Sequence, residues 1–163
     1  MKDRRFYTFL HKQITLMIGL SLIPGLGYIL LGWLHGIHIP ALIWYALVVA
    51  ISIWGYHLYH RFDYDSMGQD DIAHWYRHLT LFYYLFFLLW TIIFMLYAGE
   101  DESKLHYIAI FTQIGASVVA STLLSSDRRL YLPTIPILIG PLAIYFFLIG
   151  EWYSYILTIF SLI

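Results

Sequence analysis

The chain has 163 residues, of which 61% are hydrophobic, 20% aromatic and only 12% charged, whereas about 25% of the residues of an ordinary soluble domain are charged. This composition is typical of a protein whose surface faces lipid, and the net charge of −1 argues against nucleic-acid binding. The absence of cysteine excludes a disulfide framework, thiolate catalysis and a cysteine-ligated metal.

Hydrophobic runs recur along the chain, and each of the first five is long enough to cross the hydrocarbon core as a helix, which takes about 20 residues. In lipid every backbone amide must be paired inside the protein, and runs without a period-2 pattern achieve this only as helices. The sequence therefore predicts an all-α membrane protein, a bundle of six transmembrane helices. The predicted spans are 14–34, 41–59, 79–97, 107–124, 130–149 and 151–163.

The last of these runs is truncated at the C-terminus, because residues 151–163 offer fewer positions than a spanning helix needs. Helices and short turns take up nearly all of the chain, which leaves no room for a soluble catalytic module. We therefore expect residues 1–163 to be a transmembrane sensor domain that is not itself an enzyme. A cytoplasmic output domain is expected after residue 163.

The nine basic residues fall mostly at one set of helix ends. Eight of them precede the first span or lie in the second and fourth connections, and only Lys104 lies on the other side. Since Lys and Arg are enriched in cytoplasmic loops, the sequence predicts a multi-pass protein with a cytoplasmic N-terminus. An even number of spans would return the continuation of the chain to the cytoplasm too.

The link after the first predicted span carries two histidines, His35 and His38. They fall in the same predicted outer layer as His106 and Glu151. Imidazoles beside carboxylates titrate near neutral pH or collect a cation. We therefore expect these four residues to sense pH or a cation at the outer rim.

Histidines also gather near the cytoplasmic ends of the second and third spans. His57 and His60 are three residues apart, and His74 and His78 are four apart, spacings that place two imidazoles on one helix face. They are too few for a di-iron oxidase, but haem needs only two facing axial ligands, and His57 and His78 are the candidates. The alternative is that they are interfacial polar residues, with no metal and no cofactor in this segment.

Three aromatic residues with polar tips, Tyr83, Tyr84 and Trp90, lie deep in the third predicted span. Aromatic residues at the interface are ordinary membrane anchors, but these three lie away from it. A buried hydroxyl or indole N–H needs a hydrogen-bond partner. We therefore expect them to line an interior pocket.

The fourth predicted span is rich in small and polar residues. Gln113, Ser117 and Ser121 recur every four positions, and small residues let membrane helices approach closely. The pattern predicts a central, tightly packed helix. The sharper hypothesis is that Gln113 and the serines bind a small polar ligand; tight packing without a ligand is the alternative.

The fifth predicted span contains Pro133, Pro136 and Pro141, and the first contains Pro24. Proline inside a helix frees a backbone carbonyl and kinks the helix. Such kinks line a cavity or act as hinges in some membrane proteins, and are purely structural in others.

Two segments resemble a known family. Residues 21–33, SLIPGLGYILLGW, and 114–133, IGASVVASTLLSSDRRLYLP, are similar to the amino-terminal six-helix sensor region of bacterial membrane-bound diguanylate cyclases that carry a Gly-Gly-Asp/Glu-Glu-Phe catalytic loop. The small-residue fourth helix ending in Ser-Asp-Arg also resembles the membrane half of quorum-sensing histidine kinases. The catalytic loop itself is absent, so no catalytic residue is carried over.

This resemblance implies a sensor in the bacterial inner membrane that acts as a homodimer, detects a small-molecule signal and controls cyclic-di-GMP synthesis. GTP and Mg would bind in the following catalytic domain. Two alternatives stay open: the sensor half of a histidine kinase, and a stand-alone haem or transport protein. No mid-depth charge and no internal repeat, the usual marks of a transporter, are present in the sequence.

Overall fold

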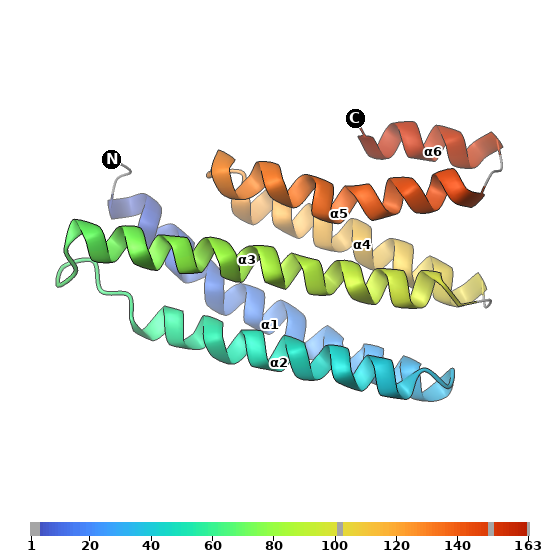
Figure 1. Ribbon diagram of the computed structural model, residues 1–163, viewed down its shortest axis with the longest axis horizontal. Coiled ribbons are helices and arrows are strands. Elements are labelled where there is room, and N and C mark those ends of the chain that lie inside the picture. The colour runs from blue at the N-terminus through green and yellow to red at the C-terminus, as the bar shows by residue number, and fades with distance from the viewer. Residues whose placement is uncertain (1–3, 101–102, 150–151, 163) are drawn as a thin grey trace. The chain divides into compact units, whose positions relative to one another are not determined.

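The computed structural model describes residues 4–100, 103–149 and 152–162, and these residues form helices without any strand. The all-helical prediction is confirmed. The helices, shown in Figure 1, are α1 (Arg4–Leu34), α2 (His38–His60), α3 (Gln69–Ala98), α4 (Ser103–Leu124), α5 (Arg128–Ile149) and α6 (Trp152–Leu162).

Within the described ranges, the five helices α1 to α5 are long and apolar enough to cross a membrane. The chain is therefore a multi-pass membrane protein. The helix α6 has 11 residues and so extends about 16 Å at 1.5 Å per residue, roughly half of the hydrocarbon core. A sixth span is not confirmed.

Two helices begin well before the apolar runs that predicted them. The helix α1 starts at Arg4 rather than at residue 14, and α3 starts at Gln69 rather than at residue 79. Hydropathy marks only the part of a helix that lies in lipid, whereas polar turns continue the same helix into water. In α3, Asp70 and Asp71 in the first turn stabilise that extension by favourable interaction with the helix dipole.

The chain divides into two compact units, residues 1–86 and 87–163, with the boundary inside α3. In the first unit α1 and α2 run antiparallel side by side (Figure 1). Their turn contains Gly36, whose φ of 78° lies in the region that glycine adopts most easily. The buried positions of α1 recur every three or four residues, as expected for a helix with one packed face: Leu10, Ile14, Met17, Ser21, Gly25, Tyr28 and Gly32.

Close contacts in the first unit depend on two glycines that face aromatic rings. A Cβ atom on Gly25 would lie 2.6 Å from Cε2 of Tyr45, and one on Gly55 would lie 2.5 Å from Cε2 of Phe82. The Tyr45 hydroxyl also donates a hydrogen bond to the Leu22 carbonyl at 3.2 Å. These contacts follow the general rule that small residues let membrane helices approach closely.

The last carbonyls of α2 are paired by side chains from the other helices of the first unit. The Trp75 Nε1–H donates to the Leu58 carbonyl at 2.9 Å, and His11 Nε2 lies 2.8 Å from the Tyr59 carbonyl. The His11 and Tyr59 rings stack with their centroids 4.1 Å apart. Because helix-terminal carbonyls lack partners within the helix, these side chains cap α2 from outside.

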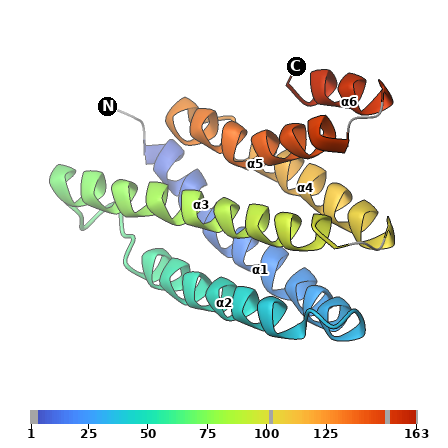
Figure 2. The ribbon, with the colours of Figure 1, turned by 45° about the vertical axis from the view of Figure 1, so that its right-hand side comes forward.

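The second unit contains the rest of α3 together with α4, α5 and α6. Consecutive helices are antiparallel neighbours, α4 with α5 and α5 with α6 (Figure 2). The Phe147 and Tyr155 rings meet edge to face at 5.8 Å. The Thr158 hydroxyl donates to the Ser154 carbonyl at 2.9 Å and also lies 3.4 Å from the Ala143 carbonyl of α5. These contacts hold α6 on the last turns of α5.

The prediction that the fourth span is central is wrong. In the apolar window of α3, 56% of residues are buried, whereas the value for α4 is 28%, the same as for α1, α2 and α5. Small residues of α4 do not all face protein: Gly115 is exposed, and a Cβ atom added to it would have nothing within 4 Å. Aromatic side chains of α3, among them Phe82, Phe87 and Phe94, are buried.

Candidate functional site

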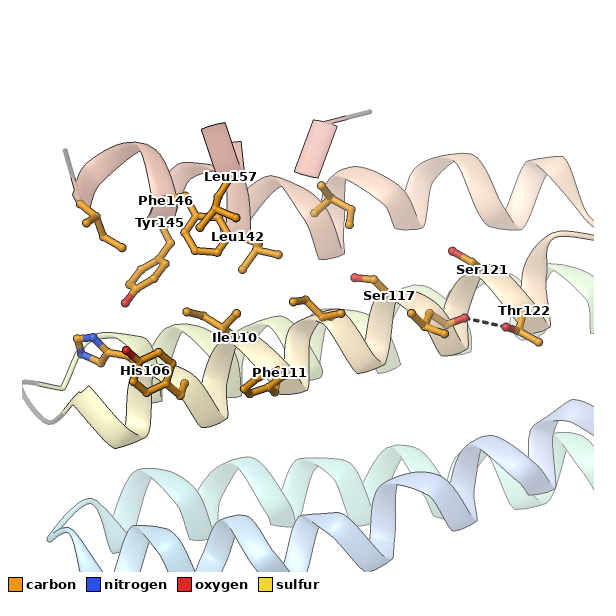
Figure 3. Close-up of a pocket in the computed structure, with 15 residues that line it drawn as sticks. His106, Ile110, Phe111, Ser117, Ser121, Thr122, Leu142, Tyr145, Phe146 and Leu157 are labelled. Carbon is orange, nitrogen blue, oxygen red and sulfur yellow. Dashed lines mark hydrogen bonds between the residues drawn. The ribbon is translucent and has the colours of Figure 1, made fainter. Parts of the chain in front are cut away.

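A groove of about 1040 Å³ lies in the second unit. Its α4 wall runs from His106 to Thr122, its α5 wall runs from Ile139 to Ile149, and Leu157 of α6 also contributes (Figure 3). The α4 wall covers 16 residue steps (106 to 122), about 24 Å along the helix. The groove therefore extends over most of the depth of a hydrocarbon core, about 30 Å.

The middle of the groove is apolar. Ile110 on α4 and Leu142 on α5 point into the space between the two helices (Figure 3). Two further lining residues, Phe111 and Val118, are 72% and 60% exposed. In a helix that crosses a membrane, such exposed apolar residues are available to lipid or to a partner chain.

At one end of the groove lie two rings that can form hydrogen bonds, the imidazole of His106 and the phenol of Tyr145. His106 on α4 and Tyr145 on α5 point toward each other (Figure 3), with ring centroids 6.0 Å apart and planes at 89°. The His106 Nε2 is hydrogen-bonded to the backbone carbonyl of Glu100. That bond fixes the imidazole at this end of the groove, beside the ring of Tyr145.

The other half of the groove carries hydroxyl groups of α4. Ser117 and Ser121 extend from α4 toward α5, and Thr122 lies one residue further along (Figure 3). The Ser117 hydroxyl donates to the Gln113 carbonyl at 2.8 Å, and the Thr122 hydroxyl donates to the Val118 carbonyl at 2.9 Å. Since a hydroxyl oxygen keeps acceptor capacity after donating, these residues present acceptors to the groove.

Gln113 does not line the groove with the two serines. It is fully buried, and its Nε2 donates to the Leu138 carbonyl at 2.6 Å and to the Thr91 hydroxyl oxygen at 3.2 Å. Its Oε1 has no hydrogen-bond partner among the described residues. The three predicted ligand residues of the fourth span are therefore divided between the helix interface and the groove.

The aromatic residues predicted to line a pocket lie outside the groove. Tyr83 is fully buried, and its hydroxyl donates to the Leu10 carbonyl at 3.4 Å. Trp90 is also buried, and Tyr84 is half-buried. Tyr83 thus has the partner that a buried hydroxyl needs, and that partner belongs to the protein itself.

The histidines predicted as haem ligands, His57 and His78, lie in the first unit, and His78 is half-buried. His57 is exposed, and His78 Nε2 lies 2.9 Å from His74 Nε2 within α3. In the part of the chain that the structure describes, no three His, Cys, Asp or Glu residues form a group able to hold a metal ion. Haem binding stays a prediction.

The predicted outer-rim residues are placed only in part. His35 and His38 are half-buried in the first unit, where the His38 ring lies 5.3 Å from that of Trp33. His106 lies in the groove of the second unit, and Glu151 falls outside the described residues. Their action as a pH or cation sensor stays a prediction.

Sequence reasoning missed two residues that matter in the second unit, Thr91 and Tyr145. Neither belongs to a sequence motif. Thr91 hydrogen-bonds the Ile137 carbonyl of α5, and the Tyr145 ring meets the His106 ring of α4. Pro141 was a usable signal for Thr91, since a proline inside a helix leaves the carbonyl four residues earlier without its usual partner. The sequence does not reveal which hydroxyl reaches that carbonyl.

Comparison of the chain with protein-family models, with curated proteins and with solved structures finds no match. The resemblance to cyclase sensor regions stays a prediction from the sequence.

Proposed function

We propose that this chain is the membrane-embedded input domain of a bacterial diguanylate cyclase, located in the inner membrane with a cytoplasmic N-terminus. It senses a small molecule dissolved in the bilayer and, as a homodimer, controls cyclic-di-GMP synthesis by a catalytic domain beyond residue 163. That catalytic domain binds GTP and Mg. The groove between α4 and α5, with polar side chains at both ends, supports the sensing role, and the resemblance of residues 21–33 and 114–133 to cyclase sensor regions supports the cyclase output.

The lining of the groove supports an amphiphilic ligand with one long apolar chain. Ligand pockets combine apolar walls with a few polar groups that fix orientation, and this groove has that arrangement. His106 and Tyr145 offer hydrogen bonds to a head group, and Ile110, Val118 and Leu142 contact the chain. Bulk lipid fills the apolar part without selectivity, so the polar ends supply the specificity.

Filling the groove tests the proposal. Val118→Trp adds an indole ring to the groove wall, while Leu132→Trp places the same ring on α5 at an exposed residue outside the groove lining. In cells producing the full-length protein, we expect Val118→Trp to change the cyclic-di-GMP level at least threefold, and Leu132→Trp to leave it unchanged. Mass spectrometry of cell extracts measures the nucleotide, and immunoblotting checks that both variants are made equally.

Two results would contradict this function. If the full-length wild-type protein leaves cyclic-di-GMP unchanged, and phosphate transfer from ATP to a histidine is found instead, the output is a kinase. If both tryptophan variants behave like wild type, the groove is not the sensing site.

A further inference from the structure

The segment of α5 just before Pro141 is hydrogen-bonded by side chains from two other helices. Pro141 has no N–H, so the Ile137 carbonyl, four residues earlier, lacks its usual intrahelical partner. The Thr91 hydroxyl of α3 donates to that carbonyl at 2.8 Å. A side-chain hydrogen bond thus replaces the backbone bond that proline removes.

Gln113 of α4 completes this arrangement. Its Nε2 bonds both the Leu138 carbonyl of α5 and the Thr91 oxygen, so one amide links all three helices. We call Thr91, Gln113 and Pro141 the α5 latch. The latch is only partly satisfied, because Gln113 Oε1 is buried with no partner among the described residues, and a partly satisfied buried polar network is less stable than a complete one.

The latch sits where the groove wall begins. On α5, the lining residues Leu142, Tyr145, Phe146 and Ile149 all follow Pro141, and Ile139 alone precedes it. A change of bend at Pro141 therefore moves nearly the whole α5 wall relative to α4. The α6 helix is expected to move with that wall, because Tyr155 of α6 packs edge to face on Phe147 of α5.

We propose that the latch sets the width of the groove: Thr91 and Gln113 are positioning residues that hold α5 at one bend, and release of their bonds lets the groove open. This regulation rests on the proposed function of the groove as a sensing site. Occupancy of the groove and the state of the latch are coupled, because a ligand wedged between α4 and α5 strains the bonds of Gln113 to Leu138.

Distance measurements test the latch without any assumption about function. Residues 1–163 contain no cysteine, so an introduced pair carries the only spin labels among them, and any cysteine of the following domain is replaced by serine. The pair Gly115→Cys and Leu148→Cys reports on the half of α5 after Pro141, and Gly115→Cys with Leu132→Cys is the control for the half before it. All three positions are exposed and none lines the groove.

In detergent-purified full-length protein, we expect Thr91→Val and Gln113→Leu to shift or broaden the 115–148 distance distribution by several ångströms and leave the 115–132 distribution unchanged. Thr91→Ser keeps the hydroxyl and should restore the wild-type distribution. Unchanged 115–148 distributions in both variants would overturn the latch. Equal changes in both pairs would also overturn it, since that result means general loosening of the unit.

A double-mutant cycle tests the role of Pro141 itself. Pro141→Ala returns an N–H that can pair with the Ile137 carbonyl, so the Thr91 bond becomes dispensable. We expect Thr91→Val to have a much smaller effect on the 115–148 distance in the Pro141→Ala background than in wild type. Additive effects would mean that Thr91 does not act through this proline.

The cyclic-di-GMP assay separates failure of the latch from failure of the sensing site. If Val118→Trp changes nucleotide levels but Gln113→Leu moves α5 without changing them, the coupling is wrong and the sensing site stands. If Gln113→Leu moves α5 and neither variant changes nucleotide levels, the distance result supports the latch, while the proposed function and its coupling to the latch are both contradicted.

Discussion

The two compact units of this chain fill the space between their helices in different ways. In the first unit aromatic rings pack directly against glycines, and side chains cap the end of α2. In the second unit α4 and α5 leave a groove of about 1040 Å³, and side chains substitute for a backbone bond at Pro141. Closely packed side chains allow few alternative arrangements. We therefore expect the helix packing of the first unit to stay unchanged, and the helices of the second unit to be able to shift.

The largest expected effect lies in the first unit, at Gly55. A Cβ there would lie 2.5 Å from the ring of Phe82, a fully buried side chain. We expect Gly55→Ala to destabilise the protein by about 1–3 kcal/mol, as overpacking generally does, seen as a lower midpoint of thermal unfolding in detergent.

The matched controls for this change are glycines with open space around them. Gly27 in the first unit and Gly115 in the second have nothing within 4 Å of an added Cβ, so alanine at either position should not destabilise the protein, and its higher helix propensity should stabilise it by up to about 1 kcal/mol. If Gly115→Ala destabilised the protein as much as Gly55→Ala does, the proposed difference in packing between the two units would be wrong.

A smaller effect is expected at the cap of α2. Trp75→Phe keeps an aromatic ring in a buried position but removes the Nε1–H that bonds the Leu58 carbonyl. Leaving that carbonyl unpaired costs about 1–2 kcal/mol. Hydrogen exchange measured by mass spectrometry should speed up in the last turn of α2, and Trp54→Phe, at a half-buried position, serves as the control. Exchange as slow as in wild type would mean that the indole bond does not hold this turn.

The smallest effect is expected at the ion pair of Arg4 with Asp65, whose nitrogen and oxygen atoms are 2.6 Å apart. Both side chains are well exposed, at 59% and 67%, and exposed pairs contribute less than about 1 kcal/mol. Asp65→Asn should lower the unfolding midpoint slightly at low salt and not at all at about 0.5 M salt, where screening is strong. A large, salt-independent loss would show that Asp65 stabilises the 61–68 connection between α2 and α3 by more than this surface contact.

The division between Gln113 and the serines shows why the site was only partly predictable. Residues four apart on an α-helix are rotated by about 40° from each other, because each residue turns the helix by about 100°. Gln113 is buried, Ser117 is half-buried and Ser121 is exposed, so two such steps carry the pattern from the helix interface into the groove. The sequence period identified a polar stripe but not where that stripe leaves the protein interior.

The sequence alone determined that this is a helical membrane protein and located the five long apolar helices, because lipid demands uninterrupted apolar helices whatever their packing. Only the tertiary structure decided that α3 is the most buried helix, that Thr91 meets the carbonyl freed by Pro141, and that His106 faces Tyr145. Each of these features depends on how a helix is rotated about its own axis and on which residues of other helices lie opposite it. The hydrophobicity of the sequence does not determine either.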